Sequence, residues 1–294
     1  MFDATLADTP GALQQSPSFA RALEALGAPP LKLPDGTLVL RRRFGPLPVS
    51  MITRPRVTSA AGLGALAGVV PVKGPRLLSP DCPLPLQEIG ALPLISPATI
   101  ATLDLSPNTD TLMAGLHQKW RNRLRHGQSQ GLRVTRQNMP DDPGHWLLQA
   151  DLVQQAARGY RSWPIPLTLA YARANPGQAK LFMAHQGKTP VAAMLILRHG
   201  STATYHIGHT RASGRLMSAH TLLMWSVILW AKSKGMQSLD LGTIDTEDAP
   251  GLARFKLGTG AQPRKLGGTW LWWPPLTSLA RPIAVIDRRM MGLG

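Results

Sequence analysis

The sequence has a single cysteine, no long apolar run and no basic leader, and each absence excludes a class of protein. With Cys82 alone, the chain has neither an internal disulfide framework nor a cysteine-based zinc cluster, so we expect a reducing compartment and no metal. Its most apolar run, Thr221 to Ala231, has 11 residues, whereas a bilayer span needs about 18 to 20. The N-terminus carries Asp3 where a signal peptide would be basic. We expect a cytoplasmic protein, with a peripheral place on the inner membrane face as an option.

Acidic residues are half as frequent as basic ones. The 294 residues include 16 Asp and Glu against 32 Lys and Arg, which gives a net charge of +16. A hydrophobic fraction of 44% excludes a disordered polybasic tail and indicates a globular chain. This length suffices for two domains of ordinary size or one large one.

The distribution of the acids is more informative than their number. The 88 residues between Asp151 and Asp240 contain no acid and ten basic residues, and the acids resume as a cluster at Asp240, Asp245, Glu247 and Asp248. Such a field attracts polyanions, which include nucleic acid, anionic lipid and a phosphate-rich small ligand. A general requirement for solubility is the alternative explanation.

Apolar spacing and turn residues predict an alternation of helices and strands. The predicted helices are Ser18–Leu26, Asn108–Gln128, His145–Ala157, Pro166–Ala174, Ser218–Lys234 and Gly251–Leu257. The predicted strands are Thr37–Phe44, Pro48–Thr53, Thr99–Leu105, Leu132–Gln137, Ala179–His185, Pro190–Arg198, Thr202–Thr210, Ser238–Leu241 and Lys265–Trp273. Short turns make the three strands from Ala179 to Thr210 an antiparallel meander. The apolar helix after them leads by a crossover to a strand with a parallel neighbour.

This element order resembles that of the GNAT superfamily of N-acyltransferases, and several segments are similar to its FemAB-like branch. Those segments are Ala203–Gly208, Arg211–Arg215, Ala219–Trp225, Leu239–Gly242, Leu252–Gly258 and, upstream, the basic helix Gln118–Arg125. The resemblance covers roughly residues 90 to 273. Its most specific parts are Phe255-Lys256 and Asp240-Leu241-Gly242 at this spacing.

The resemblance implies an α/β fold with a GNAT-like mixed sheet flanked by helices. We expect residues 1–106 to form a Pro/Gly-rich α/β half, which would be a degenerate second GNAT-like copy. Residues 107–294 would form the catalytic domain, with a basic helix at 108–128. The implied activity is transfer of an acyl group from acyl-CoA to an amine by direct attack. Two alternatives stay open: a Fem-type aminoacyltransferase that uses aminoacyl-tRNA, and a non-enzymatic basic adaptor on an anionic membrane or nucleic acid.

A candidate phosphate-binding loop lies between the last meander strand and the apolar helix. A turn here points backbone N–H groups at a ligand, and the following helix N-terminus favours a pyrophosphate. The GNAT pattern R/Q-x-x-G-x-G/A matches at Arg211 and Gly214, whereas Leu216 replaces the second small residue. A basic turn present for folding reasons is the alternative. The candidate donor-binding residues are Arg211, Ser213, Gly214, Arg215 and Ser218.

Four residues are candidates for the chemistry. An attacking amine must lose a proton, and either Asp240 or His206 could accept it, although Asp240 could equally cap a turn. Tyr205 shares the strand with His206 and would border the acyl site, and both rank above His209 and His220. Lys256 is the strongest candidate by resemblance, because an ammonium can neutralise a phosphate or the oxyanion on the acyl carbonyl.

Two basic patches are candidate contacts for tRNA or an anionic membrane. They contain Arg41, Arg42 and Arg43 in one, and Lys119, Arg121 and Arg125 in the other. A solvated surface is the alternative for both. Trp120, inside the second patch, would cover the core or stack on a base. Trp270, Trp272 and Trp273 would cover a sheet edge, or else seat an acyl chain or a membrane surface.

Overall fold

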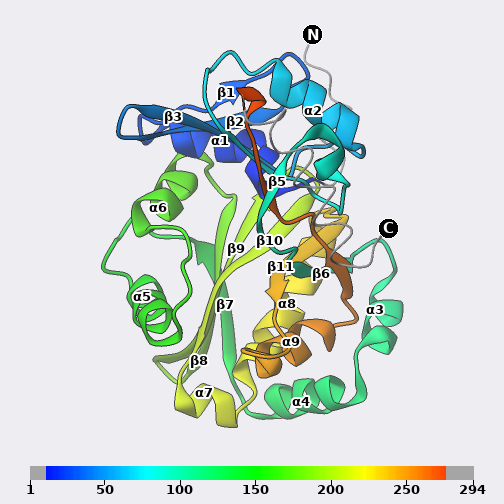
Figure 1. The fold of residues 1–294 in the computed structure, drawn as a ribbon. Helices are drawn as coiled ribbons and strands as arrows, with labels where there is room; N and C mark the ends of the chain where they lie inside the picture. Colours follow the sequence, from blue (N-terminus) through cyan, green and yellow to red (C-terminus); the bar gives the residue numbers. More distant parts are fainter. Residues whose placement is uncertain (1–10, 276–294) are drawn as a thin grey trace. The chain divides into compact units, whose positions relative to one another are not determined.

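A computed structural model describes residues 11–275, which form two compact units (Figure 1). The first unit contains the described residues up to Gly27 together with Ile100–Arg264, and the second contains Ala28–Thr99 together with the described residues after Arg264. The division does not follow the predicted boundary between residues 106 and 107. The reason is that α1 (Pro17–Glu24) joins the first unit, whereas β13 (Thr269–Trp272) joins the second.

The first unit is built on a mixed seven-stranded sheet of order β12-β6-β11-β10-β9-β8-β7. Strands β7 to β10 pair antiparallel, and β10 pairs parallel with β11, so the predicted meander and crossover are confirmed. The strands are β6 (Thr99–Asp104), β7 (Arg133–Asn138), β8 (Ala179–Gln186), β9 (Thr189–His199), β10 (Thr202–Thr210), β11 (Ser238–Ile244) and β12 (Gln262–Lys265).

Helices cover both faces of this sheet. The apolar helix α8 (Ala219–Ser233) packs on β8, β9 and β10, where Leu223, Ile228 and Met194 are fully buried. α5 (Trp146–Arg158) and α6 (Ile165–Ala174) lie across the sheet from α8 (Figure 1). α1, preceded by a short 3-10 helix (Leu13–Gln15), packs on α6. Its Arg21 Nε donates to Asn175 Oδ1 at 2.9 Å, which explains why the N-terminal helix belongs to this unit.

The second unit has a mixed six-stranded sheet of order β1-β2-β3-β4-β13-β5. Only β3 and β4 pair in parallel among the pairs described here. Its remaining elements are β1 (Leu31–Lys32), β2 (Leu38–Phe44), β3 (Leu47–Thr53), α2 (Ala60–Gly68), β4 (Arg76–Ser79), a 3-10 helix (Leu86–Ile89) and β5 (Leu92–Ile95). Val39, Ile52, Leu63 and Leu78 form a fully buried core. The predicted α/β class, with mixed sheets flanked by helices, is confirmed in both units.

Two predicted elements are wrong in the same way, since each is divided. The helix expected at 108–128 is α3 (Thr109–Gly115) and α4 (Gln118–Ser129). Leu116 is extended between them, and the His117 ring caps α4 by accepting from Lys119 N–H at 3.3 Å. The strand expected at Lys265–Trp273 is not continuous. Lys265 is the last residue of β12 in the seven-stranded sheet, and Thr269–Trp272 form β13 in the six-stranded sheet. β13 lies between β4 and β5, so its tryptophans are not at a sheet edge.

No helix within residues 11–275 is long and apolar enough to cross a membrane. In the same part of the chain, no group of three or more His, Cys, Asp or Glu side chains is arranged to hold a metal ion.

Candidate active site

The site lies where β10 and β11 separate. Their parallel pairing covers only Thr202–Thr204 opposite Ser238–Asp240, although both strands continue for several residues. A bulge between Tyr205 and Ile207, in the pairing of β10 with β9, occurs just beyond that point. A bulge re-aims side chains and ends regular pairing. Tyr205 and His206 therefore lie on the part of β10 that still pairs with β9 but no longer pairs with β11.

Tyr205 belongs to a buried polar network at the start of α8. Its hydroxyl shares a hydrogen bond of 3.1 Å with His220 Nε2, and the other ring nitrogen of His220 shares one of 2.8 Å with Thr210 Oγ1. Burial lowers the pKa of His220 to about 4, helped by His209, so this imidazole is neutral at pH 7. Burial raises the pKa of Tyr205, which keeps the phenol protonated. Tyr205 is thus placed as a neutral hydroxyl in a fixed orientation.

Gly208 makes room for this network. A Cβ at Gly208 would lie 1.9 Å from Tyr205 Oη and 2.9 Å from Cε1 of His220. Contacts this close do not occur between real atoms, so any larger residue must displace the tyrosine or the histidine. Only glycine at position 208 leaves room for the side chains of Tyr205 and His220.

Lys256 and Asp240 form the charged part of the site. Lys256, on α9 (Pro250–Leu257), is only 5% exposed, and its ammonium donates to the Thr243 carbonyl at 2.6 Å and lies 6.0 Å from the centre of the Tyr205 ring. Burial lowers the pKa of Lys256 to about 8, while Asp240 opposes that shift. Asp240, 7% exposed, accepts from Gly242 N–H at 2.8 Å, as a turn cap would. Lys256, Tyr205 and Asp240 are thus brought together.

His206 lies on the other side of the strand. Its Nε2 shares a hydrogen bond of 3.0 Å with Thr168 Oγ1 of α6, and its ring packs on Trp163 at 4.8 Å. Burial lowers its pKa to about 4. The structure does not join His206 to Lys256 and Asp240, because the alternation of a strand sends neighbouring side chains to opposite faces.

The predicted phosphate-binding turn is wrong in its conformation, because residues Ala212–Leu216 form a short helix, α7, rather than a loop. Gly214 is buried against β9, where a Cβ would lie 2.4 Å from the Val191 carbonyl oxygen, so packing alone requires glycine there. Arg211, Ser213 and Arg215 are exposed around it. The Arg211 guanidinium lies 5.1 Å from the centre of the Trp146 ring.

Ser218 joins α7 to α8 in a left-handed conformation, with φ of 51°. Its carbonyl accepts the first hydrogen bonds of α8, from Thr221 and Leu222 N–H. The N–H groups of Ala219 and His220 precede those bonds, as in the first turn of any helix. Anions bind well at such a terminus. The Ser218 hydroxyl shares a hydrogen bond of 3.2 Å with His126 Nδ1 of α4, so this side chain has a partner within the protein.

Sequence reasoning missed three members of this site. His220 was ranked below His206, yet it holds Tyr205, while Thr210 and Gly208 were given no role in the site. The pattern T-Y-x-x-G-x-T followed ten residues after Thr210 by His is present in the sequence. The spacing alone does not predict the network, because His220 reaches Tyr205 and Thr210 only once α8 is packed on β10.

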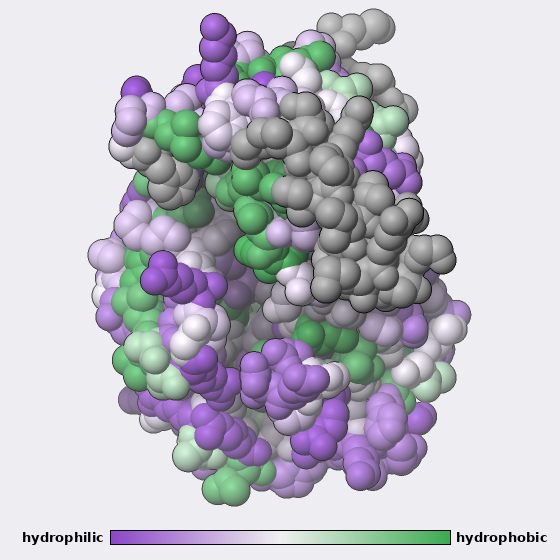
Figure 2. Space-filling model, in the orientation of Figure 1, coloured by the Kyte–Doolittle hydropathy of each residue, from purple (hydrophilic) through white to green (hydrophobic). Residues whose placement is uncertain are grey.

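The basic patches are exposed. Hydrophilic residues gather over α4 at the foot of the molecule (Figure 2), where Lys119 and Arg125 are exposed and Arg121 is half-buried. Arg41, Arg42 and Arg43 are exposed on β2 in the second unit. Trp120 is 4% exposed and donates from Nε1 to the Phe255 carbonyl at 3.1 Å, so it covers the core, as one of its two interpretations predicted.

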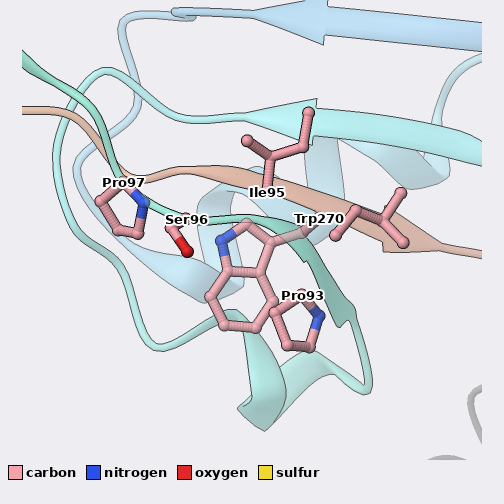
Figure 3. Close-up of a pocket in the computed structure, with 6 residues that line it drawn as sticks. Pro93, Ile95, Ser96, Pro97 and Trp270 are labelled. Carbon is pink, nitrogen blue, oxygen red and sulfur yellow. The ribbon is translucent and has the colours of Figure 1, made fainter. Parts of the chain in front are cut away.

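The second unit contains a small surface pocket of about 240 Å³ (Figure 3). It is lined by Pro93, Leu94, Ile95, Ser96, Pro97 and Trp270. Trp270 Nε1 donates to the Gly267 carbonyl at 2.8 Å, and its ring forms one wall. No titratable side chain lines the pocket, so it offers no chemistry of its own.

The sequence model of the acetyltransferase (GNAT) domain matches residues 115–263, which are half of the chain and contain strands β7 to β11 of the seven-stranded sheet. The chain belongs to the GNAT acetyltransferase family. This GNAT protein is accordingly an enzyme of the acyltransferase type, and the non-enzymatic adaptor considered from its charge is set aside. A comparison with curated protein sequences finds no match.

Solved structures extend the likeness in fold over both units. The crystal structure of FemX is 14% identical, with a TM-score of 0.73 over 95% of this chain and 97% of that one. A conserved protein of unknown function from Bacteroides thetaiotaomicron is 12% identical, with a TM-score of 0.57 over 91% and 94%. The C-terminal domain of a putative lysylphosphatidylglycerol synthetase from Agrobacterium fabrum is 12% identical, with a TM-score of 0.52 over 88% and 88%. The predicted FemAB-like fold is confirmed.

Proposed function

We propose that this GNAT protein transfers an acyl group from acyl-CoA to an amine by direct attack, without an acyl-enzyme. The observation that carries the proposal is Lys256, a lysine only 5% exposed, beside Tyr205 and Asp240 where β10 and β11 part. Burying an ammonium group lowers the stability of the fold unless hydrogen bonds or a negative charge compensate, so a buried lysine is a candidate for a functional role. The function that fits is stabilisation of the oxyanion that forms on the acyl carbonyl.

The roles of the residues follow from their positions. The amine nitrogen attacks the thioester carbonyl and the carbon–sulfur bond breaks. The proton that the nitrogen loses balances the one that the leaving sulfur takes, so the products are an amide and a thiol. We assign this transfer to the Tyr205 hydroxyl, which burial keeps protonated and whose ring centre lies 6.0 Å from the Lys256 ammonium: it gives its proton to the sulfur and takes up the proton from the nitrogen. Asp240 supports the ammonium electrostatically. We assign His206 a packing role, because it faces α6.

The donor phosphates would meet the first turn of α8, with Arg211 and Arg215 exposed beside it. Ser213 is exposed on α7 and could add a hydroxyl, whereas Gly214 is explained by packing and Ser218 by its bond to His126. This site fits a pyrophosphate through helix N–H groups and flexible arginines. We place the enzyme in the cytoplasm.

Aminoacyl-tRNA is the second candidate donor, and the exposed residues of α4 favour it. Lys119 and Arg125 lie on the same unit as Lys256, and binding through them would weaken steeply with salt. The basic residues Arg41, Arg42 and Arg43 could instead bind an anionic membrane surface, which is the third candidate role for the positive charge of this protein.

Calorimetry with coenzyme A and acetyl-CoA tests the proposed donor. We expect binding that weakens at least about tenfold in an Arg211→Ala, Arg215→Ala double variant, since charge-assisted hydrogen bonds are lost. Absence of binding at millimolar ligand would reject acyl-CoA. A filter assay with tRNA across a salt series then decides the alternative.

A further inference from the structure

Asp151 is a buried carboxylate with neutral partners. It lies on α5 and is 7% exposed. Tyr160 Oη donates to its Oδ1 at 3.0 Å, and Gln155 Nε2 donates to its Oδ2 at 2.7 Å. Gly159, in the left-handed conformation with φ of 68°, turns the chain at the end of α5 so that Tyr160 can reach back. The local fold thus holds this carboxylate in a fixed place.

Asp151 has no positively charged partner among the described residues. Within residues 11–275 neither Lys, Arg nor His forms an ion pair with Asp151, although the chain carries a net charge of +16. Removing a carboxylate from water without a counter-charge costs several kcal/mol, which neutral hydrogen bonds only partly offset. A buried carboxylate that no cation of residues 11–275 pairs with provides a place for a cation from outside.

His209 lies on β10, the strand that α5 packs against, and supplies a second acceptor. Its Nδ1 is buried and makes no hydrogen bond within the described residues. Burial lowers the pKa of His209, as do Arg215 and Arg211, while Asp151 opposes that shift. The ring is therefore neutral at pH 7, and its Nδ1 has hydrogen-bonding capacity that no residue of the described part of the chain uses. Its edge contacts Trp146 of α5, at 6.1 Å between ring centres.

This place adjoins the proposed chemistry. Besides burial, Tyr160 and Asp151 both raise the pKa of Tyr205, so these three groups lie within electrostatic range of one another. Figure 2 shows the surface hollowed beside α5. Arg158, the last residue of α5, is exposed, acts electrostatically on both His209 and Tyr160, and forms no ion pair in the described part of the chain.

We propose that Asp151 and the Nδ1 side of His209 bind the ammonium group of the acceptor, and that Arg158 binds an acidic group on the same molecule. The acceptor is then a zwitterionic amine, such as an amino acid, rather than a polyamine. An ammonium has three N–H donors, which suit a carboxylate and a ring nitrogen together. The identification of this ligand as the acceptor rests on the proposed function.

Three probes of one carbon skeleton test the proposal by ligand-observed NMR titration without any acyl donor: 5-aminopentanoate, pentylamine and pentanoate. We expect wild-type protein to bind 5-aminopentanoate most tightly and pentylamine more tightly than pentanoate. Asp151→Asn should weaken both amines at least about tenfold and leave pentanoate within twofold. Arg158→Gln should remove only the advantage of 5-aminopentanoate over pentylamine.

Two control variants separate binding from folding. Tyr160→Phe removes a partner of Asp151 but keeps the carboxylate, so amine binding should persist. Asp110→Asn removes an exposed acid of α3 and should change nothing. Equal losses in Asp151→Asn and Tyr160→Phe would make Asp151 structural and overturn the proposal. Wild-type protein that does not prefer pentylamine to pentanoate would overturn it without any variant. Since the titration contains no acyl donor, failure to bind coenzyme A leaves this result unaffected.

Discussion

Lys256 differs from an ordinary lysine because its charge is held out of water. Most lysines keep the ammonium in solvent and bury only the stem, whereas here the ammonium donates to a backbone carbonyl and lies close to an aromatic ring. Its pKa of about 8, lowered by burial, means that a modest rise in pH removes the charge. Activity that needs the ammonium should share that sensitivity.

Replacement by a neutral side chain of similar length tests this role. We expect Lys256→Met to lower kcat/KM at least 100-fold, since removal of one oxyanion donor costs about 10²–10³. The free energy of unfolding should fall as well, because the buried Asp240 carboxylate loses this cation, so activity is compared at a temperature where both variants are folded. Lys188→Met, in the exposed turn after β8, is the matched control and should keep full activity. Equal activity in the two variants would contradict the role.

The pH dependence follows from the direction of the shift. Lys256 loses its proton near pH 8 in the folded protein, rather than near the 10.5 of a free lysine. The rate should therefore fall as pH rises through about 8 and should be unaffected by this group below about 7. A rate profile that stays flat to pH 10 would show that the ammonium is not required.

Gly208 offers a test of the polar network that leaves its polar groups intact. Gly208→Ala places a methyl group on the Tyr205 hydroxyl, so the bond from Tyr205 to His220 must break or lengthen. We expect about a tenfold or greater loss of kcat with a smaller change in KM. Gly251→Ala on α9, where a methyl group meets nothing within 4 Å, should be neutral or stabilising by up to about 1 kcal/mol. ¹⁵N NMR of His220 would report the altered tautomer directly.

At the scale of the element, the sequence predicted what depends on local pattern. The meander, α8 and the parallel strand after it were recognisable, because alternation and apolar periodicity report burial directly. The break between α3 and α4 was not, because it depends on His117, whose N–H donates to the carbonyl of Gly258, 141 residues away. Lys256 and Tyr205 were found by resemblance, whereas the pairing of Tyr205 with His220 depends on how β10 and α8 pack.

The junction of α7 and α8 provides a prediction of its own. A non-glycine residue in the left-handed region, such as Ser218, costs roughly 1–2 kcal/mol. Ser218→Gly should raise the free energy of unfolding by up to about 1 kcal/mol, whereas Ser218→Val should lower it by at least as much. Urea denaturation measures both. If donor binding survives in Ser218→Gly, the backbone of this junction rather than the hydroxyl serves the ligand.

At the scale of the whole molecule, two buried histidines link stability to acid. Burial lowers the pKa values of His206 and His220 to about 4, whereas both are about 6.5 when unfolded. Between those values the unfolded chain binds more protons than the folded one, so stability must fall as pH drops from 6.5 toward 4. We expect a loss of about 2 kcal/mol or more by pH 4.5, measured by urea denaturation. His206→Gln should remove about half of that dependence.

The pairing of β13 fixes when the second unit can be completed. Strands β4 and β5 each pair along one edge with β13, which begins about 190 residues after the end of β4 and about 175 after the end of β5. Until the ribosome has made Thr269–Trp272, both strands present unpaired edges, and such edges are open to aggregation. The first unit, with its antiparallel meander, has by then been synthesised in full. Most of the second unit, Ala28–Thr99, is made before Ile100–Arg264, yet this unit must finish folding after the first, so its open strand edges are exposed to aggregation throughout that interval.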